Sequence, residues 1–101
     1  MHVHNRSTSV SFIGDNTLLG NNDAIAPGCN KKWFYDFGTD CFDMIPVGSQ
    51  SKTYTGKCYI KNGDVVSTTQ SFSELGGDYF TIEWDKGTFD FKQEIEIYLS
   101  D

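Results

Sequence analysis

An alternating pattern of side chains and a two-residue turn signal occur together in residues 53–72, TYTGKCYIKNGDVVSTTQSF. Successive side chains of an extended strand point to opposite faces, so alternate residues share one face. The pattern predicts a strand over residues 53–61 that buries one face. The inward set is Tyr54, Gly56, Cys58 and Ile60, and the outward set is Thr53, Thr55, Lys57, Tyr59 and Lys61.

The dipeptide Asn62-Gly63 follows this strand and predicts a hairpin with a two-residue loop. A type I′ turn needs positive φ at both central residues, and Asn and Gly adopt it at low cost. This register sets Lys61 opposite Asp64 and Tyr59 opposite Val66, in a second strand over residues 65–72. Residues 71–75 offer the one candidate for a single helical turn.

Alternation recurs along the rest of the chain and predicts strands over residues 9–13, 32–37, 42–45, 80–84, 89–91 and 93–99. A four-residue loop after Trp84 would set Trp84 opposite Phe89 and Ile82 opposite Phe91. The good helix formers Ala and Leu are scarce. The predicted fold is all-β: a single antiparallel β-sandwich, or a small barrel, of about seven to nine short strands.

Length and charge limit the architecture and the partners. The 101 residues predict a single domain over residues 1–101, with residues 1–6 as a flexible N-terminal tail. No apolar run is long enough for a transmembrane segment. Fourteen Asp and Glu against eight Lys and Arg give a net charge of -6, which disfavours nucleic acid. The compartment and a homo-oligomer stay open, and the sequon Asn5-Arg6-Ser7 has meaning only on a eukaryotic secretory route.

Three cysteines leave two redox states open: either all are reduced, or one disulfide leaves one thiol over. Cys29 and Cys41 are the expected pair, because both lie in a turn-rich segment. Cys58 instead occupies an inward strand position.

The chain has few residues of the types that usually carry catalysis or bind transition metals. His2 and His4 lie in the expected tail, where a nucleophile–histidine pair would have no rigid frame. The cysteines have no Cys-x-x-Cys spacing for zinc. We therefore expect no enzyme activity, no cofactor and no metal site. His2-Val3-His4 could form a weak surface metal site, but a solvated tail is favoured over it. Asx-rich loops around residues 15–23 and 36–43 leave calcium open, although neither matches the twelve-residue calcium loop.

Four carboxylates occupy outward positions near the last strands and are candidates for partner binding: Glu83, Asp90, Glu94 and Glu96. The predicted register sets Glu83 opposite Asp90, and like charges at that spacing repel. Solvent, a neighbouring lysine, a bound cation or a basic partner has to offset the repulsion between these carboxylates. A solvated face or a partner surface is favoured over a cation site, and catalysis by the paired carboxylates comes last.

Aromatic side chains on outward positions give the clearest indication of binding. Tyr59, Tyr79 and Tyr98, with Phe34 near them, are the candidate ligand-binding residues. Exposed aromatic rings stack on sugars, sit at membrane interfaces or anchor protein partners. The alternative is that some of them are packed under loops.

Three stretches of the chain resemble the second half of aegerolysins, small acidic β-sandwiches that bind membrane lipids. These stretches are Ile45–Ser49, Gly56–Asp64 and Trp84-Asp85. The resemblance implies a sandwich fold and lipid binding, and we carry no site residue over from it. Taken together, the sequence favours a non-enzymatic recognition module for a lipid, glycan or protein surface, which binds through outward tyrosines and an acidic rim. The alternative is an acidic inhibitor or immunity-type protein that blocks a basic site on a partner.

Overall fold

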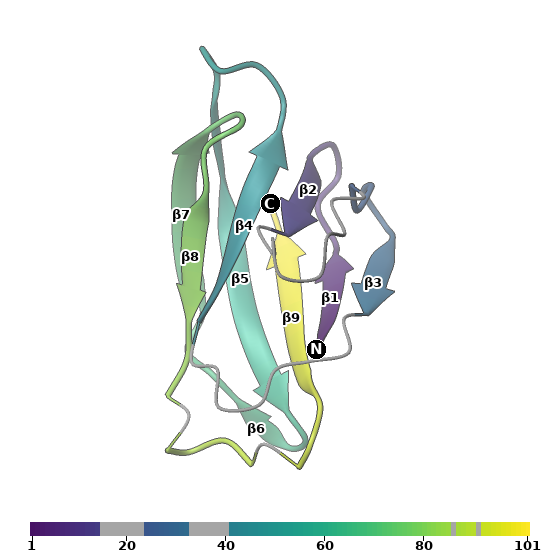
Figure 1. Ribbon diagram of the computed structural model, residues 1–101, viewed down its shortest axis with the longest axis vertical. Helices are drawn as coiled ribbons and strands as arrows, with labels where there is room; N and C mark the ends of the chain where they lie inside the picture. The colour runs from purple at the N-terminus through teal and green to yellow at the C-terminus, as the bar shows by residue number, and fades with distance from the viewer. Residues whose placement is uncertain (15–23, 33–40, 86, 91) are drawn as a thin grey trace.

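The computed structural model describes residues 1–14, 24–32, 41–85, 87–90 and 92–101, and these residues form nine strands and no helix (Figure 1). The strands fall into two separate sheets. The expected all-β class is therefore confirmed, while a closed barrel is not seen in the described residues.

The larger sheet has the order β3(Asn30–Lys32), β1(His2–Asn5), β9(Ile95–Ser100) and β5(Thr53–Asn62), and β5 also pairs with β6(Val65–Val66) and β7(Gln70–Leu75). Its β1–β9 pair is parallel and its other pairs are antiparallel, so the sheet is mixed. The smaller sheet is antiparallel, with β4(Cys41–Val47) between β2(Ser11–Gly14) and β8(Phe80–Glu83). The expectation of purely antiparallel pairing is wrong, because the two ends of the chain meet side by side in the same direction.

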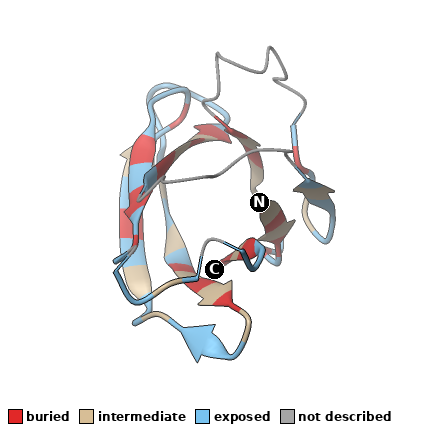
Figure 2. Ribbon diagram, turned by 60° about the horizontal axis from the view of Figure 1, so that its bottom comes forward, coloured by how far each residue is buried: buried red, intermediate tan, exposed pale blue. Residues whose placement is uncertain are grey.

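Residues from both sheets form one buried core. Strands β1, β2, β4 and β8 and the second half of β5 bury alternate residues. Figure 2 shows the buried stretches in red between tan and pale blue ones. Rings from both sheets meet in this core, where Phe72 of β7 stacks on Phe80 of β8 with 4.3 Å between ring centres. The fully buried side chains include Val3, Ile60, Ile97 and Leu99 of the larger sheet and Phe12, Met44 and Ile82 of the smaller one.

The expected flexible tail over residues 1–6 is wrong, since His2–Asn5 is strand β1. Val3 and Asn5 are buried in the core. The backbone of β1 pairs with β9 on one side and with β3 on the other. The side chain of Asn5 donates to the carbonyl oxygens of Val10 and Ile25, at 2.7 and 2.8 Å. Because its amide nitrogen is buried and engaged, the folded protein has no room for a glycan at the sequon.

The hairpin after β5 exists, but its turn lies one residue later than expected. Lys61 pairs with Val66 and Asn62 with Val65, so the loop residues are Gly63 and Asp64. Gly63 alone takes the positive φ, at 60°. Asn62 stays on the inner face and is buried, where its side chain accepts from the Asp90 N–H and donates to the Asp90 and Gln93 carbonyls. The hydrogen bonds of the buried Asn62 side chain, rather than turn geometry, set the register of the hairpin.

Two further local expectations are corrected. The predicted helical turn over residues 71–75 belongs to strand β7, which pairs with β5. The predicted hairpin after Trp84 does not form, because β8 ends at Glu83 and pairs with β4 through Ile82 and Phe42. Residues 87–90 are turn and coil, and Phe91 lies outside the described residues.

The Cys29–Cys41 disulfide, which the sequence leaves open, is not formed in the structure. None of the three cysteines forms a disulfide; Cys29 and Cys41 are exposed and Cys58 is buried. The alternative in which all three thiols are reduced is the one that the structure shows.

Candidate functional site

Three aromatic rings lie in a row across the outer face of the larger sheet. The register places Tyr98 of β9 directly beside His4 of β1 and Tyr59 of β5. The His4 and Tyr98 ring centres are 4.4 Å apart and the rings are within 3° of parallel, while the Tyr98 and Tyr59 centres are 4.8 Å apart at 10°. This spacing matches the distance of about 4.8 Å between neighbouring strands, so in-register rings stack without distorting the sheet. We call His4, Tyr98 and Tyr59 the ring row.

Arg6 covers the ring row from the end of β1. Its Cζ lies 4.3 Å from the centre of the Tyr98 ring, a cation–π contact, and its Nη1 donates to the Tyr59 hydroxyl at 3.4 Å. The backbone N–H of Arg6 donates to the Leu99 carbonyl at 2.7 Å. The guanidinium is therefore held over the two tyrosines by both its side chain and its backbone.

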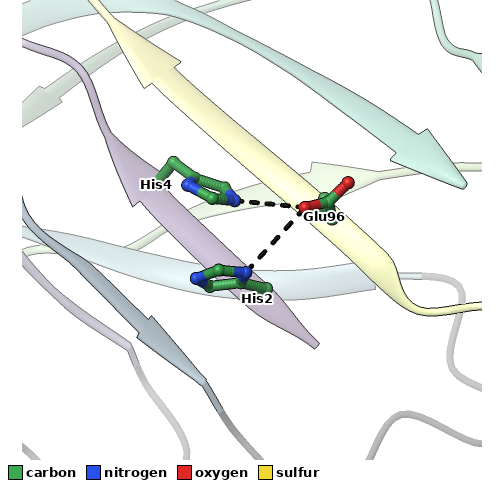
Figure 3. A group of neighbouring side chains, drawn as sticks. All are labelled: His2, His4 and Glu96. Carbon is green, nitrogen blue, oxygen red and sulfur yellow. Dashed lines mark hydrogen bonds and ion pairs between the residues drawn. The ribbon is translucent and has the colours of Figure 1, made fainter.

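A cluster of His2, His4 and Glu96 adjoins the ring row (Figure 3). The register sets His2 directly beside Glu96, and His4 follows two residues later on the same face of β1. Glu96 Oε1 lies 3.3 Å from His4 Nε2 and 3.8 Å from His2 Nδ1. On its other side, His2 places Nε2 at 2.8 Å from the side-chain oxygen of Asn30 on β3. Three neighbouring strands thus fix the cluster.

The partial burial of this face changes the protonation of its groups. Burial lowers the pKa of His4, and the nearby His2 lowers it further, while the hydrogen bond and charge of Glu96 oppose the shift. Burial raises the pKa of Tyr98, and the Glu96 carboxylate adds to that effect. Tyr98 is therefore a neutral phenol at neutral pH, and His4 favours its neutral form.

The structure brings together two of the four aromatic residues expected to bind ligand. Tyr59 and Tyr98 stack on the outer face, although Tyr98 is only 9% exposed because His4, Arg6 and Tyr59 cover it. Tyr79 lies apart from them in the β7–β8 turn and is 59% exposed. Phe34 lies outside the described residues, as do most of the Asx-rich loops named as calcium candidates. Asp43, the described exception, accepts from the Thr81 hydroxyl at 2.6 Å.

The four carboxylates expected to bind a partner do not form one surface. Glu83 lies opposite Cys41 rather than opposite Asp90, which sits in a turn beside Asn62. The expectation that Glu83 and Asp90 face each other and repel is therefore wrong. Glu94 lies 3.7 Å from Lys32 Nζ, and Glu96 belongs to the histidine cluster. Glu94 and Glu96 therefore lie at the larger sheet, and Glu83 lies on the smaller one.

From the sequence, His2 and His4 were considered only as a weak surface metal site in a solvated tail, and Arg6 was missed. All three lie in the segment expected to be a tail. The available signal was the alternation of Val3 and Asn5 with these polar residues, which puts His2, His4 and Arg6 on one face of a strand.

Away from this face, a concavity of about 380 Å³ lies near β6, β7 and β8, and its lining includes Val65, Val66, Gln70 and Trp84. One of its polar side chains holds two strands together, since the Gln70 amide donates to the Glu83 carbonyl at 2.6 Å and joins β7 to β8. The outer face of the larger sheet is therefore the stronger candidate site.

Comparisons of the chain with protein-family models, curated proteins and solved structures found no match, so they give no support to the resemblance to aegerolysins. The described residues contain no helix with the length and apolarity needed to cross a membrane.

Proposed function

We propose that this protein is a non-enzymatic β-sandwich recognition module that binds an acidic glycan on the outer face of its larger sheet. Tyr59 and Arg6 form the centre of this surface, and Lys57 and Lys61 flank it. Tyr98 and His4 hold the centre in place. The ring row, with Arg6 over it, is the observation that carries the proposal.

Stacked aromatic side chains lie on the outer face of the larger sheet. One face of such a sheet normally packs on the core and the other carries polar residues. Here the inner face is filled by residues such as Ile60 and Ile97, and Tyr59 and Tyr98 lie outside the core cluster, although Tyr98 is itself buried. A partner that uses the Tyr59 ring and hydroxyl explains why they are outside.

Three cations near Tyr59 favour an anionic ligand, although Glu96 lies opposite Lys61 on the same face and the chain as a whole is acidic. Lys57 and Lys61 lie two residues on either side of Tyr59 and share its face. Within the described part of the chain, neither lysine makes an ion pair, and Arg6 contacts only rings and a hydroxyl. Carboxylate or sulfate groups would pair with these cations while a pyranose ring packs on Tyr59.

The experiment is titration of the protein with heparin and polygalacturonate fragments, with dextran as a neutral glycan and with anionic liposomes. We expect binding to the acidic glycans that weakens at least tenfold in Tyr59→Ser and Arg6→Gln. Tyr79→Ser is the matched control, since Tyr79 is exposed outside this face, and it should bind as the wild type does. Equal losses in Tyr59→Ser and Tyr79→Ser, or binding to liposomes alone, would reject the proposal.

The alternative is an acidic protein that blocks a basic site, and the net charge of -6 favours it. The exposed carboxylates Glu83 and Asp90 would then carry the contact. In that case Glu83→Lys would slow association with a basic partner protein and remove its salt dependence, and Tyr59→Ser would leave binding unchanged.

A further inference from the structure

We infer that His2, His4 and Glu96 form a binding site for one divalent transition-metal ion of the zinc type. The ion would be held by His2 Nδ1, His4 Nε2 and Glu96 Oε1, with at least one coordination position left for water or an anionic ligand group. This site shares His4 with the ring row, but the argument for it does not rest on the proposed glycan recognition.

The distances suit a small ion. Zinc ligands at about 2.0 to 2.1 Å in a tetrahedron lie about 3.4 Å from one another. Glu96 Oε1 already lies 3.3 Å from His4 Nε2 and 3.8 Å from His2 Nδ1. One ligand atom from each of the three residues lies within 4.8 Å of the others. Bringing the three ligand atoms to these distances around one ion therefore requires the side chains to move by about 1 Å.

A second contact selects the nitrogen of His2 that would bind. The Asn30 side-chain oxygen is an acceptor, so the His2 Nε2 that lies 2.8 Å from it carries a proton. In the neutral ring, Nδ1 then has a bare lone pair that faces the Glu96 carboxylate. At 3.8 Å the two acceptors make no hydrogen bond, and a cation between them would satisfy both. Metal-binding histidines commonly donate their other N–H in this way.

The ring of His4 is held by its neighbour Tyr98. The two rings are stacked at 4.4 Å, which fixes the plane of the imidazole and directs Nε2 toward Glu96, to which it donates a hydrogen bond at 3.3 Å. An ion would take the place of that proton between Nε2 and Oε1, and the proton would move to Nδ1 or to solvent. The three side chains keep 16 to 28% of their surface exposed, so an ion can enter from solvent. Two imidazoles with one carboxylate favour zinc, copper, nickel or iron over calcium and magnesium, which prefer oxygen ligands.

The test is calorimetric titration of the full chain with Zn²⁺ at neutral pH. We expect one ion per chain, with affinity reduced at least tenfold in Glu96→Gln and His4→Gln. Glu94→Gln is the matched control, because Glu94 is a carboxylate two residues away that contacts Lys32 instead. Asn30→Ala should weaken binding about tenfold through the orientation of His2. Wild-type affinity in Glu96→Gln, or an equal loss in Glu94→Gln, would overturn the site.

Two measurements on the unmodified protein guard against misfolded variants and against zinc on the exposed cysteines. Co²⁺ should give visible bands without the near-ultraviolet charge-transfer band of thiolate ligation, and that band would overturn the proposal. In nitrogen-15 spectra of the imidazoles, Zn²⁺ should shift His2 Nδ1 and His4 Nε2. Unchanged ring resonances at saturating Zn²⁺ would overturn it equally.

Discussion

Two asparagines show how far a residue's role depends on partners that are distant in the sequence. Asn5 and Asn62 are both almost fully buried, and each amide serves backbone groups of another segment. Local preference assigned one to a tail and the other to a turn, because asparagine is common in both. The carbonyls that they satisfy, at Ile25 and Gln93 among others, are invisible to any local pattern.

Asn5→Ala is expected to lower the free energy of unfolding by about 2 to 4 kcal/mol. The carbonyls of Val10 and Ile25 each lose one of two donors and keep only the Ser7 hydroxyl and the Phe12 N–H, and the buried backbone N–H of Ser7 loses its acceptor. Urea unfolding followed by fluorescence measures the change. Asn30→Ala removes an exposed amide and should cost less than about 1 kcal/mol. Equal midpoints for the two variants would contradict this account.

Cys58 is expected to be the unreactive thiol and to make stability fall at high pH. Burial raises its pKa from 9.0 to about 11, so the thiol of the folded protein stays protonated where that of the unfolded chain ionises. The contribution of the buried thiol to the free energy of unfolding is complete below pH 9 and is lost as the pH rises through 11. Ellman's reagent at pH 8 should modify the exposed Cys29 and Cys41 quickly and Cys58 only on unfolding. The destabilisation caused by Cys58→Ala should shrink between pH 8 and pH 11, and a constant difference would refute the raised pKa.

At the scale of strands, periodicity predicted faces well and pairing partners poorly. Cys58 and Ile60 are buried and Thr53 and Lys57 are exposed, as the alternation in β5 predicts. The expected hairpin after Trp84 failed because β8 finds its partner in β4, some forty residues earlier. A two-residue period states which side chains share a face and contains no information about the strand beside them.

The same limit applies to the candidate site. Tyr59 and Tyr98 could be placed on outward positions from their own strands. Their stacking depends on the β5–β9 register, and the contribution of His4 depends on the parallel β1–β9 pair. Long-range pairing of the two ends of the chain creates the ring row and the histidine cluster, so neither could be read from local sequence.

Gly56 is expected to tolerate no side chain, although it lies in the middle of a strand. A Cβ at this position would collide with the carbonyl oxygen of Ser100 and lie 2.7 Å from Cζ of the Phe72 ring. Gly56→Ala should therefore lower the free energy of unfolding by about 2 to 3 kcal/mol, because backbone and core ring both have to move. Gly87→Ala, in an exposed turn where the nearest atom is 3.0 Å away, should change it by less than about 0.5 kcal/mol. Thermal unfolding of both variants measures the difference, and similar melting temperatures would show that the strand accommodates a methyl group.

At the scale of the molecule, β1 joins the first residues of the chain to the last strand. Its inner face adds Val3 to the core, and its outer face supplies two of the three ligands of the inferred metal site. It also separates β9 from the three-residue strand β3. The segment that looked least structured in the sequence therefore holds together the core, the edge of the larger sheet and the candidate site.

Deletion of residues 1–6 is accordingly expected to abolish cooperative unfolding. The deletion removes the buried Val3 and Asn5 and leaves the backbone of β9 without a partner on one side, and an unpaired edge in the body of a sheet promotes association. Circular dichroism during heating and the mass in solution test this expectation. The control is the double variant His2→Gln/His4→Gln, which keeps β1 and its inner face and should lose less than about 1 kcal/mol. A truncated chain that melts at the wild-type temperature would show that β1 is dispensable. The histidine cluster would then rest on a strand that contributes nothing to stability.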